Sequence, residues 1–370
     1  MSERALNDAD ETVTIKRLAQ ILGVAHSTVS RALNGHPAIS EATKKRVEEA
    51  AARYGYVPSG AARMLRNARS GVIGLIIPDI RNSFYSTVAK AIADMAAESS
   101  WQMEVAATCR AGCDMRASAE SSWQMVVATT DDQPEREREA VRSLMKARAE
   151  SIIIAPTAEP SAETVKMLKR VYTLQLLRRH PSIRAPSITV DDRAGIGMAT
   201  RHLLDLGHRR IGYIGRESNV STGLARLRGF VECFDLPDDA QQRLVLVPRR
   251  AEYGASALRS LLARAKPPTA IVLGSPEFTS GVLEVADEDA LRIPEDLSLV
   301  CYGDSVWNRF LHGGLTTVKL PEKEIANSCV EMLRKRLAAS TDKTEESRPN
   351  DETSICFQPW LVIRHSSRKL

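Results

Sequence analysis

The stretch from Thr14 to Asn34, TIKRLAQILGVAHSTVSRALN, constrains the fold of this chain more than any other. Thr14 is a good N-cap, and the apolar residues that follow it recur at helical spacing on one face. Gly23 stands where a helix ends and the backbone needs a positive φ. A second helix is predicted to begin at His26. Two short helices joined by a tight turn form a unit of the size that enters the major groove of DNA.

The outer face of the second predicted helix carries His26, Ser27 and Arg31, because Val29 and Leu33 turn inward. In a helix-turn-helix the N-terminal residues of the second helix meet base edges. Arg can read guanine with two hydrogen bonds, while Ser and Thr suit phosphates or several bases. Any amphipathic helical hairpin would share this pattern, so these residues alone leave DNA binding and a purely structural role both open.

The continuation of the chain is more specific. A Ser-capped helix is predicted from Ser40 to Arg53, and YGYVPSGAARML follows at residues 54–65. With TVSRALN before it and IGLIIP at residues 73–78 after it, the chain resembles bacterial transcription repressors of the lactose-repressor (LacI/GalR) family. The resemblance covers about 350 of the 370 residues.

The resemblance implies a homodimeric, sequence-specific repressor that binds a pseudo-palindromic double-stranded DNA operator and is controlled by a small-molecule effector. The alternative is a sugar-binding protein without DNA regulation, and the basic segment 13–70 argues against it. The residues expected at the DNA are Thr14, Arg17, His26, Ser27, Thr28, Ser30, Arg31, Asn34, Ala62 and Leu65.

Charge is unevenly distributed along the chain. Residues 13–70 hold ten Lys or Arg against three Glu, a net charge of +7. Residues 1–12 hold one Arg against four acidic residues, a net charge of −3, and are predicted to be a disordered tail. The excess positive charge therefore lies in the segment that is predicted to meet phosphates.

Composition and motifs bound the class of protein. No stretch holds 18 apolar residues, and the N-terminus lacks the apolar segment of a signal peptide, so we expect a cytoplasmic, nucleoid-associated protein without a membrane partner. The six cysteines are expected to be reduced thiols; Cys109 and Cys113 are close-spaced, but no second ligand pair accompanies them. No metal or cofactor is predicted, and without a GxSxG, HExxH or P-loop motif an enzyme is disfavoured.

After residue 70, short apolar runs alternate with amphipathic helices, which indicates two doubly wound parallel sheets. The predicted fold is a three-helix helix-turn-helix domain plus an α/β two-lobed domain that resembles periplasmic sugar-binding proteins. The predicted boundaries are a tail (1–12), the DNA-binding domain (13–57), a hinge-helix linker (58–70), and an effector-binding and dimerisation domain (71–370) with one lobe of 71–186 and 321–338 and another of 187–320 and 354–364.

The linker is rich in Ala and Arg and too short for a stable isolated helix. The resemblance implies that it orders when two copies pair in the minor groove. Leu65 matches the family's apolar wedge, which unstacks a base step and bends the duplex. The alternative is that Leu65 is an ordinary apolar linker residue.

One feature departs from the family. Glu98 to Met103, ESSWQM, recurs as Glu120 to Met125, and an apolar run follows each copy. A tandem duplication of the first lobe's second strand is therefore predicted near 98–125, with one copy in the sheet and the other as a surface insertion. The second copy is favoured as the strand, because TTDD at 129–132 leads straight into a helix. Since this strand lies near the family's dimer contact, we hypothesise that the insertion perturbs dimerisation.

The resemblance places the effector contacts in loops at strand ends. Phe84 and Tyr85 match an aromatic pair that suits a sugar ring or a flat base, although packing at the start of a helix would also explain them. Arg226 matches a family arginine that reaches into the cleft and bonds ligand hydroxyls or carboxylates, and Thr222 matches another ligand-contacting position.

Two departures concern the ligand. Gly303 stands where most relatives carry an Asp that binds sugar hydroxyls, so Asp304 or Trp307 is predicted to replace it. GSPEF at 274–278 replaces the usual Asn-Asp pattern. Arg178 follows a predicted strand, although it or the arginine beside it could be solvated. Together these residues favour a carbohydrate-like or sugar-acid effector over a standard hexose.

Overall fold

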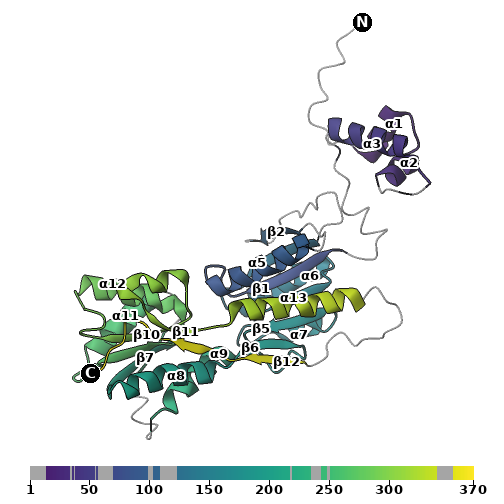
Figure 1. Cartoon of the computed structure of the whole chain (residues 1–370). Coiled ribbons are helices and arrows are strands. Elements are labelled where there is room, and N and C mark those ends of the chain that lie inside the picture. Colours follow the sequence, from purple (N-terminus) through teal and green to yellow (C-terminus); the bar gives the residue numbers. More distant parts are fainter. Residues whose placement is uncertain are drawn as a thin grey trace, which may run out of the picture. The chain divides into compact units, whose positions relative to one another are not determined.

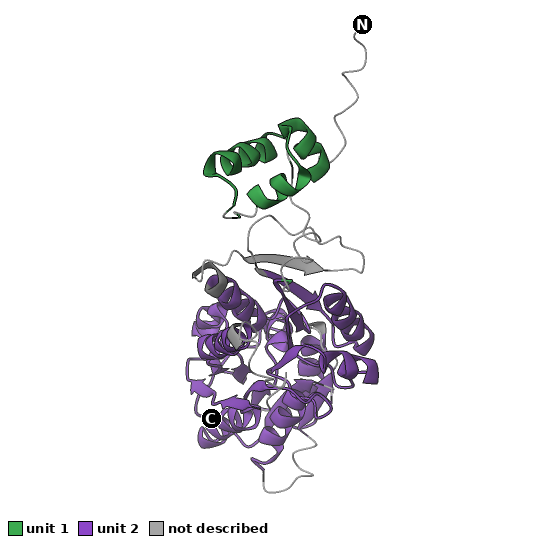
Figure 2. Ribbon diagram, turned by 90° about the vertical axis from the view of Figure 1, so that its right-hand side faces the viewer, with its two compact units in different colours: residues 1–70, 112–122 green, residues 71–111, 123–370 purple. Residues whose placement is uncertain are grey.

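The computed structural model describes residues 14–33, 36, 38–54, 56, 70–98, 103–108, 123–216, 219–234, 243–247, 251–339 and 353–370. The chain divides into two compact units, one of residues 1–70 with 112–122 and one of residues 71–111 with 123–370 (Figure 2). Within the described ranges, no helix is long and apolar enough to cross a membrane.

The first unit contains the predicted helix-turn-helix. The Thr14 side chain accepts a hydrogen bond from the backbone N–H of Arg17 at 3.3 Å, and Gly23 ends the first helix with a φ of 66°. Ser40 caps the third helix as predicted. The helices are α1 (Ile15–Leu22), α2 (His26–Ala32) and α3 (Glu41–Arg53).

Each helix of this unit buries apolar side chains against the other two. Leu18 from α1, Val29 from α2 and Val47 from α3 are fully buried in one cluster. Burial of a Leu or Val side chain contributes roughly 1.5–3 kcal/mol, so this small core is what holds the three short helices together. The guanidinium of Arg46 also donates to the carbonyl of Leu22 at 2.9 Å and joins α3 to the end of α1.

The second unit contains two sheets flanked by helices (Figure 1). Among the described residues, the first sheet has seven parallel strands in the order β12-β6-β5-β4-β1-β3-β2. These strands are β1 (Val72–Ile77), β2 (Met103–Thr108), β3 (Trp123–Thr129), β4 (Ser151–Ile154), β5 (Tyr172–Leu176), β6 (Ser187–Val190) and β12 (Ser354–Phe357). Its helices are α5 (Ser83–Glu98), α6 (Pro134–Lys146), α7 (Ala162–Leu168) and α13 (Glu322–Ala339).

The two faces of the first sheet are buried under different helices. Ile73, Leu75 and Ile77 of β1 belong to the cluster that includes α5 and α13, whereas Val72 and Ile76 belong to the cluster of α6 and α7. This alternation is that of a strand covered on both faces, and it confirms the predicted doubly wound arrangement.

Gly74 in β1 has a packing reason. A Cβ atom at this position would lie 2.4 Å from Cδ1 of Leu144 in α6, so any larger residue would force the Leu144 side chain to move.

The described part of the second sheet has six strands in the order β13-β11-β10-β9-β7-β8, parallel except for β13, which is antiparallel to β11. The strands are β7 (Ile211–Arg216), β8 (Leu244–Val247), β9 (Ala270–Leu273), β10 (Ser298–Tyr302), β11 (Thr316–Lys319) and β13 (Trp360–Val362). The helices are α8 (Asp192–Asp205), α9 (Ser221–Val231), α11 (Ala251–Leu262) and α12 (Thr279–Glu288), with short 3-10 turns η1 (Pro276–Phe278), η2 (Val306–Arg309) and η3 (Leu311–Gly313).

The predicted division of the lobes was wrong at two strands. Residues 187–190 and 354–357 were assigned to the second lobe, but β6 and β12 pair with each other in the first sheet. The chain therefore passes between the sheets after β6, after β11, and between β12 and β13. A four-residue apolar run shows that a strand forms, but its distant hydrogen-bond partner is not encoded in that run.

Both copies of the duplicated segment form strands. β3, the second copy, pairs with β1 as predicted, with Gly74 opposite Val126. The expected surface insertion was wrong, because β2, the first copy, pairs in parallel with the other side of β3. The first copy keeps a strand-forming apolar run, and the outer edge of β3 offers backbone groups that it can pair with. Residues 109–122, including Cys109 and Cys113, lie outside the described residues.

Candidate functional site

The outer face of α2 presents the side chains that were predicted to read DNA. His26, Ser27 and Arg31 are exposed, whereas Thr28 and Ser30 are half-buried beside the core. Thr14 and Arg17 are exposed at the start of α1. The remaining predicted DNA contacts, Asn34, Ala62 and Leu65, lie outside the described residues, as does the hinge linker apart from Ser70.

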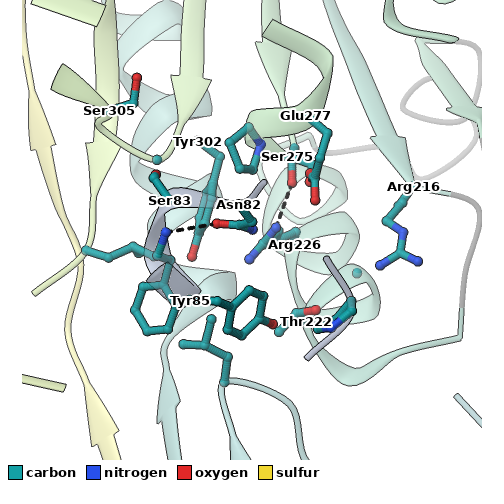
Figure 3. Close-up of a pocket in the computed structure, with 18 of the residues that line it drawn as sticks. Asn82, Ser83, Tyr85, Arg216, Thr222, Arg226, Ser275, Glu277, Tyr302 and Ser305 are labelled. Carbon is teal, nitrogen blue, oxygen red and sulfur yellow. Dashed lines mark hydrogen bonds between the residues drawn. The ribbon is translucent and has the colours of Figure 1, made fainter. Parts of the chain in front are cut away.

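A cleft of about 820 Å³, open solvent included, lies between the two lobes of the second unit (Figure 3). The first lobe and the crossover into it contribute Pro78, Asn82, Ser83, Phe84, Tyr85, Leu177, Arg178, Leu320 and Glu322. The second lobe contributes Tyr213, Arg216, Thr222, Gly223, Arg226, Gly274, Ser275, Pro276, Glu277, Tyr302, Gly303, Asp304 and Ser305. Most of these residues follow the carboxyl ends of parallel strands, where open α/β sheets bind ligands.

The cleft brings together six of the seven residues predicted at the effector: Phe84, Tyr85, Arg178, Thr222, Arg226 and Asp304. Trp307 is not among the lining residues. It lies in the short turn η2 with 71% of its surface exposed, so the geometry gives no support to stacking of Trp307 on a ligand.

The aromatic pair serves two roles. Phe84 and Tyr85 are each 3% exposed and their rings meet edge to face, with centroids 5.5 Å apart. Both also belong to a large buried hydrophobic cluster that contains residues of both lobes. The packing role and the cleft-lining role were alternatives in the sequence, and the structure combines them.

Arg226 is held in place by groups of its own lobe. Its Nε donates to Asp192 Oδ1 at 2.7 Å. Its Nη1 donates to the carbonyl of Gly274 at 3.0 Å, the dashed line at Arg226 in Figure 3. The guanidinium lies 3.8 Å from the centroid of the Tyr302 ring. Burial alone would lower the pKa of Arg226, but the charge of Asp192 and the neighbouring tyrosines raise it, so the side chain stays charged.

Asp304 is committed to a structural ion pair. Its two carboxylate oxygens accept from Arg364 at 2.8 and 3.0 Å, and Oδ1 also accepts from the Thr317 hydroxyl at 3.0 Å. The side chain is 4% exposed. The predicted role of Asp304 as a free acceptor for ligand hydroxyls is therefore not supported by the geometry. Burial alone would raise its pKa, but the hydrogen bonds from Arg364 and Thr317 lower it below the usual value.

Sequence reasoning missed an ion-pair network beside the cleft. Asp132 bonds Arg178 through one carboxylate oxygen and Arg216 through the other. Burial alone would lower the pKa of Arg178, but Tyr85 and Asp132 raise it above the usual value, so this side chain also stays charged. The available signal was position: Arg216 is the last residue of the apolar run IGYIGR, at the carboxyl end of β7.

The remaining candidates for chemistry are structural. His208 bonds the Thr269 hydroxyl at 2.8 Å and the carbonyl of Arg368 at 3.1 Å, and His202 bonds Ser367 at 2.9 Å. Both histidines therefore hold the C-terminal segment in place. In the part of the chain that the structure describes, no group of three or more His, Cys, Asp or Glu could hold a metal ion.

Comparison with known proteins agrees with this arrangement. Residues 14–59 match the family described as bacterial regulatory proteins, lacI family, and residues 200–367 match a periplasmic binding protein-like domain. A helix-turn-helix transcriptional regulator from the aml 5′ region of Streptomyces limosus is 30% identical over 368 residues, covering 97% of this chain and 96% of the relative. The regulator GalR of Escherichia coli K12 is 28% identical over 356 residues, covering 95% of each chain.

A solved structure shows the same fold. The Lac repressor dimer bound to operator and the anti-inducer ONPF matches with a TM-score of 0.71 at 21% identity, covering 97% of this chain and 100% of that chain. The predicted fold class, a helix-turn-helix unit followed by a two-lobed α/β unit, is confirmed.

The fold and its relatives define a helix-turn-helix, DNA-binding transcriptional regulator. The chain belongs to the LacI family of bacterial transcriptional regulators. The expectation that it is not an enzyme is confirmed by this family membership.

Proposed function

We propose that the chain is a homodimeric repressor that acts in the nucleoid and whose affinity for a pseudo-palindromic operator is set by a small effector in the cleft. The observation that carries this proposal is the cleft itself, where six residues chosen from the sequence alone come together between two lobes. The Lac repressor, which has the same fold, was solved as a dimer with both operator and a small molecule bound.

The DNA contacts are proposed to come from the exposed face of α2. His26, Ser27 and Arg31 would meet base edges, and Arg17, Thr28 and Ser30 would meet phosphates. Residues 13–57 would form the DNA-binding domain and 58–70 the hinge, in which Leu65 would open the minor groove. The net charge of +7 over residues 13–70 supports this assignment.

The effector is proposed to be carbohydrate-like or a sugar acid. Phe84 and Tyr85 offer apolar faces for a ring, and Thr222 offers a hydroxyl. Arg178 and Arg226 are charged and nearly buried at the cleft, where a guanidinium binds hydroxyls or a carboxylate strongly. Gly303 removes the Asp side chain that the family pattern would place here.

Selection from a random DNA pool tests the whole proposal. Purified full-length chain is cycled over the pool with and without a panel of sugars and sugar acids. We expect one enriched pseudo-palindromic site whose occupancy one compound changes. Enrichment of no site, together with tight binding of a sugar, would favour a ligand-binding protein without DNA regulation.

A matched pair of variants tests the role of α2. Arg31→Ala should weaken binding to the selected site by ~1–3 kcal/mol if the side chain reads a base, with little loss on random DNA. Arg53→Ala removes an exposed arginine from the end of α3 and serves as the control. An equal loss on both DNAs after Arg31→Ala would identify a phosphate contact instead.

A further inference from the structure

The carboxylate of Asp132 joins two arginines that belong to different lobes. Asp132 follows β3 and Arg178 follows β5, both in the first sheet. Arg216 is the last residue of β7, in the second sheet. One carboxylate oxygen bonds Nη1 of Arg178 and the other bonds Nη2 of Arg216. The pair with Arg178 therefore lies within the first lobe, and the pair with Arg216 crosses between the lobes.

A second contact joins the two lobes next to this ion pair. The backbone N–H of Arg179 donates to Oγ of Ser221 at 3.0 Å. Arg179 follows β5 in the first lobe, and Ser221 begins α9 in the second lobe. The end of β5 thus meets the second lobe through both the Arg178–Asp132–Arg216 network and this hydrogen bond.

The crossing ion pair is shielded from water. The side chains of Asp132 and Arg216 are 14% and 11% exposed. A charge pair in such a place is screened far less than a pair on the surface. Removal of one partner leaves the other charge buried, so separation of the lobes is costly unless water or a ligand replaces the lost partner.

The other charged pair at the cleft does not cross. Arg226 in α9 and Asp192 in α8 both belong to the second lobe, so their bond at 2.7 Å is kept whatever the angle between the lobes. Opening of the cleft would break the Asp132–Arg216 pair and spare the Arg226–Asp192 pair. The two pairs therefore have different roles: one positions a group at the cleft, and the other holds the lobes together.

We propose that the Asp132–Arg216 pair is a latch that holds the two lobes closed in the absence of effector. By setting the population of the closed form, the latch sets the operator affinity of the ligand-free regulator. This second statement rests on the proposed function, whereas the closure itself does not.

The amide of Arg179 provides a direct reporter of closure. Hydrogen–deuterium exchange is measured on the full-length protein, with the peptide spanning residues 172–180 as readout. Arg216→Met removes the charge and keeps a long side chain, and Asp132→Asn provides a second, nearly isosteric variant. We expect the exchange rate of this peptide to rise about tenfold or more in each variant, because each loses a charge-assisted hydrogen bond between the lobes.

A control variant and a double variant make the result specific. Arg193→Met breaks an exposed pair with Glu232 that joins α8 and α9 within the second lobe, and it should leave this exchange unchanged. Because one interaction is lost in either case, the double variant Arg216→Met with Asp132→Asn should exchange no faster than the faster single variant. Unchanged exchange in both folded single variants would overturn the latch.

Operator affinity of the same proteins tests the consequence for DNA. We expect Arg216→Met to change ligand-free affinity for the selected operator at least about threefold, and Arg193→Met to leave it unchanged. If exchange rises while affinity stays the same, the latch does not set operator affinity. If the wild-type chain selects no operator, the proposed function fails, and the exchange measurement still decides whether the latch exists.

Discussion

The two copies of ESSWQM have the same sequence and occupy different places in the molecule. The copy at 120–125 runs into β3, which lies between two strands, while the copy at 98–103 runs into β2, which pairs with β3 alone among the described strands. Nine of the eleven residues from 98 to 108 recur at 120–130. Strand formation is therefore encoded in the repeat, and the place of each strand must be decided by residues outside it.

The residues that follow the two copies differ in charge and in their tolerance of positive φ. Asp131 and Asp132 follow the second copy and have φ values of 47° and 60°, a conformation that Asp tolerates better than most residues. At the same distance after the first copy stand Cys109 and Arg110. An arginine in place of Asp132 would face two further guanidinium groups. The turn after β3, and the arginines it must meet, thus select the second copy for the position beside β1.

Asp132→Arg should lower stability the most. It places after the second copy the positive charge that Arg110 carries after the first copy. Two buried arginines would lose their shared carboxylate and gain a like charge. We expect the free energy of unfolding to fall by about 3–5 kcal/mol, as for other broken buried pairs. Urea unfolding measures this free energy. Asp131→Asn is the control, because the Asp131 side chain is half exposed. A loss below about 1 kcal/mol would show that this turn does not choose between the copies.

Substitution of the equivalent methionines should have an intermediate effect. Met125 in β3 is fully buried, so Met125→Ala is expected to cost roughly 2–5 kcal/mol in unfolding free energy. Met103→Ala, at the matching position of the first copy, should cost less, because among the described strands β2 pairs on one side only, with β3. Equal losses in thermal or urea unfolding would contradict the difference between an interior and an edge strand.

Deletion of residues 98–119 should have the smallest effect on stability. The deletion joins Ala97 to Glu120 and restores the local sequence ESSWQM after α5, so β3 can follow this helix directly. We expect the melting temperature to change by less than about 2 °C, which corresponds to roughly 1 kcal/mol or less. Sedimentation of the same protein tests our hypothesis that the duplication perturbs dimerisation. An equally tight dimer with and without these residues would reject it.

Local chemistry explains which predictions succeeded. Thr14, Gly23 and Ser40 delimit helices through contacts within three to five residues, and such contacts can be read from the sequence. The cleft residues Phe84 and Arg226 were found through their resemblance to a family pattern. These features follow from neighbouring residues or from a shared motif, so no knowledge of distant packing was needed.

The failures share a different cause. Asp304 meets Arg364, 60 positions along the chain, and Arg216 meets Asp132, 84 positions away. The pairing of β6 with β12 spans 167 positions at Ser187 and Ser354. No local sequence pattern predicts these distant partners, because the packing of complete sheets determines them. The sequence therefore predicted which residues surround the cleft better than what holds them there.

The three crossings between the sheets limit how the lobes can move. The segments after β6, after β11 and between β12 and β13 all connect the same two bodies, so a twist or slide of one lobe would have to deform three backbones at once. Bending at these segments is therefore the lobe motion that we expect. A ligand in the cleft of the second unit would then act mainly by changing the angle between the two sheets.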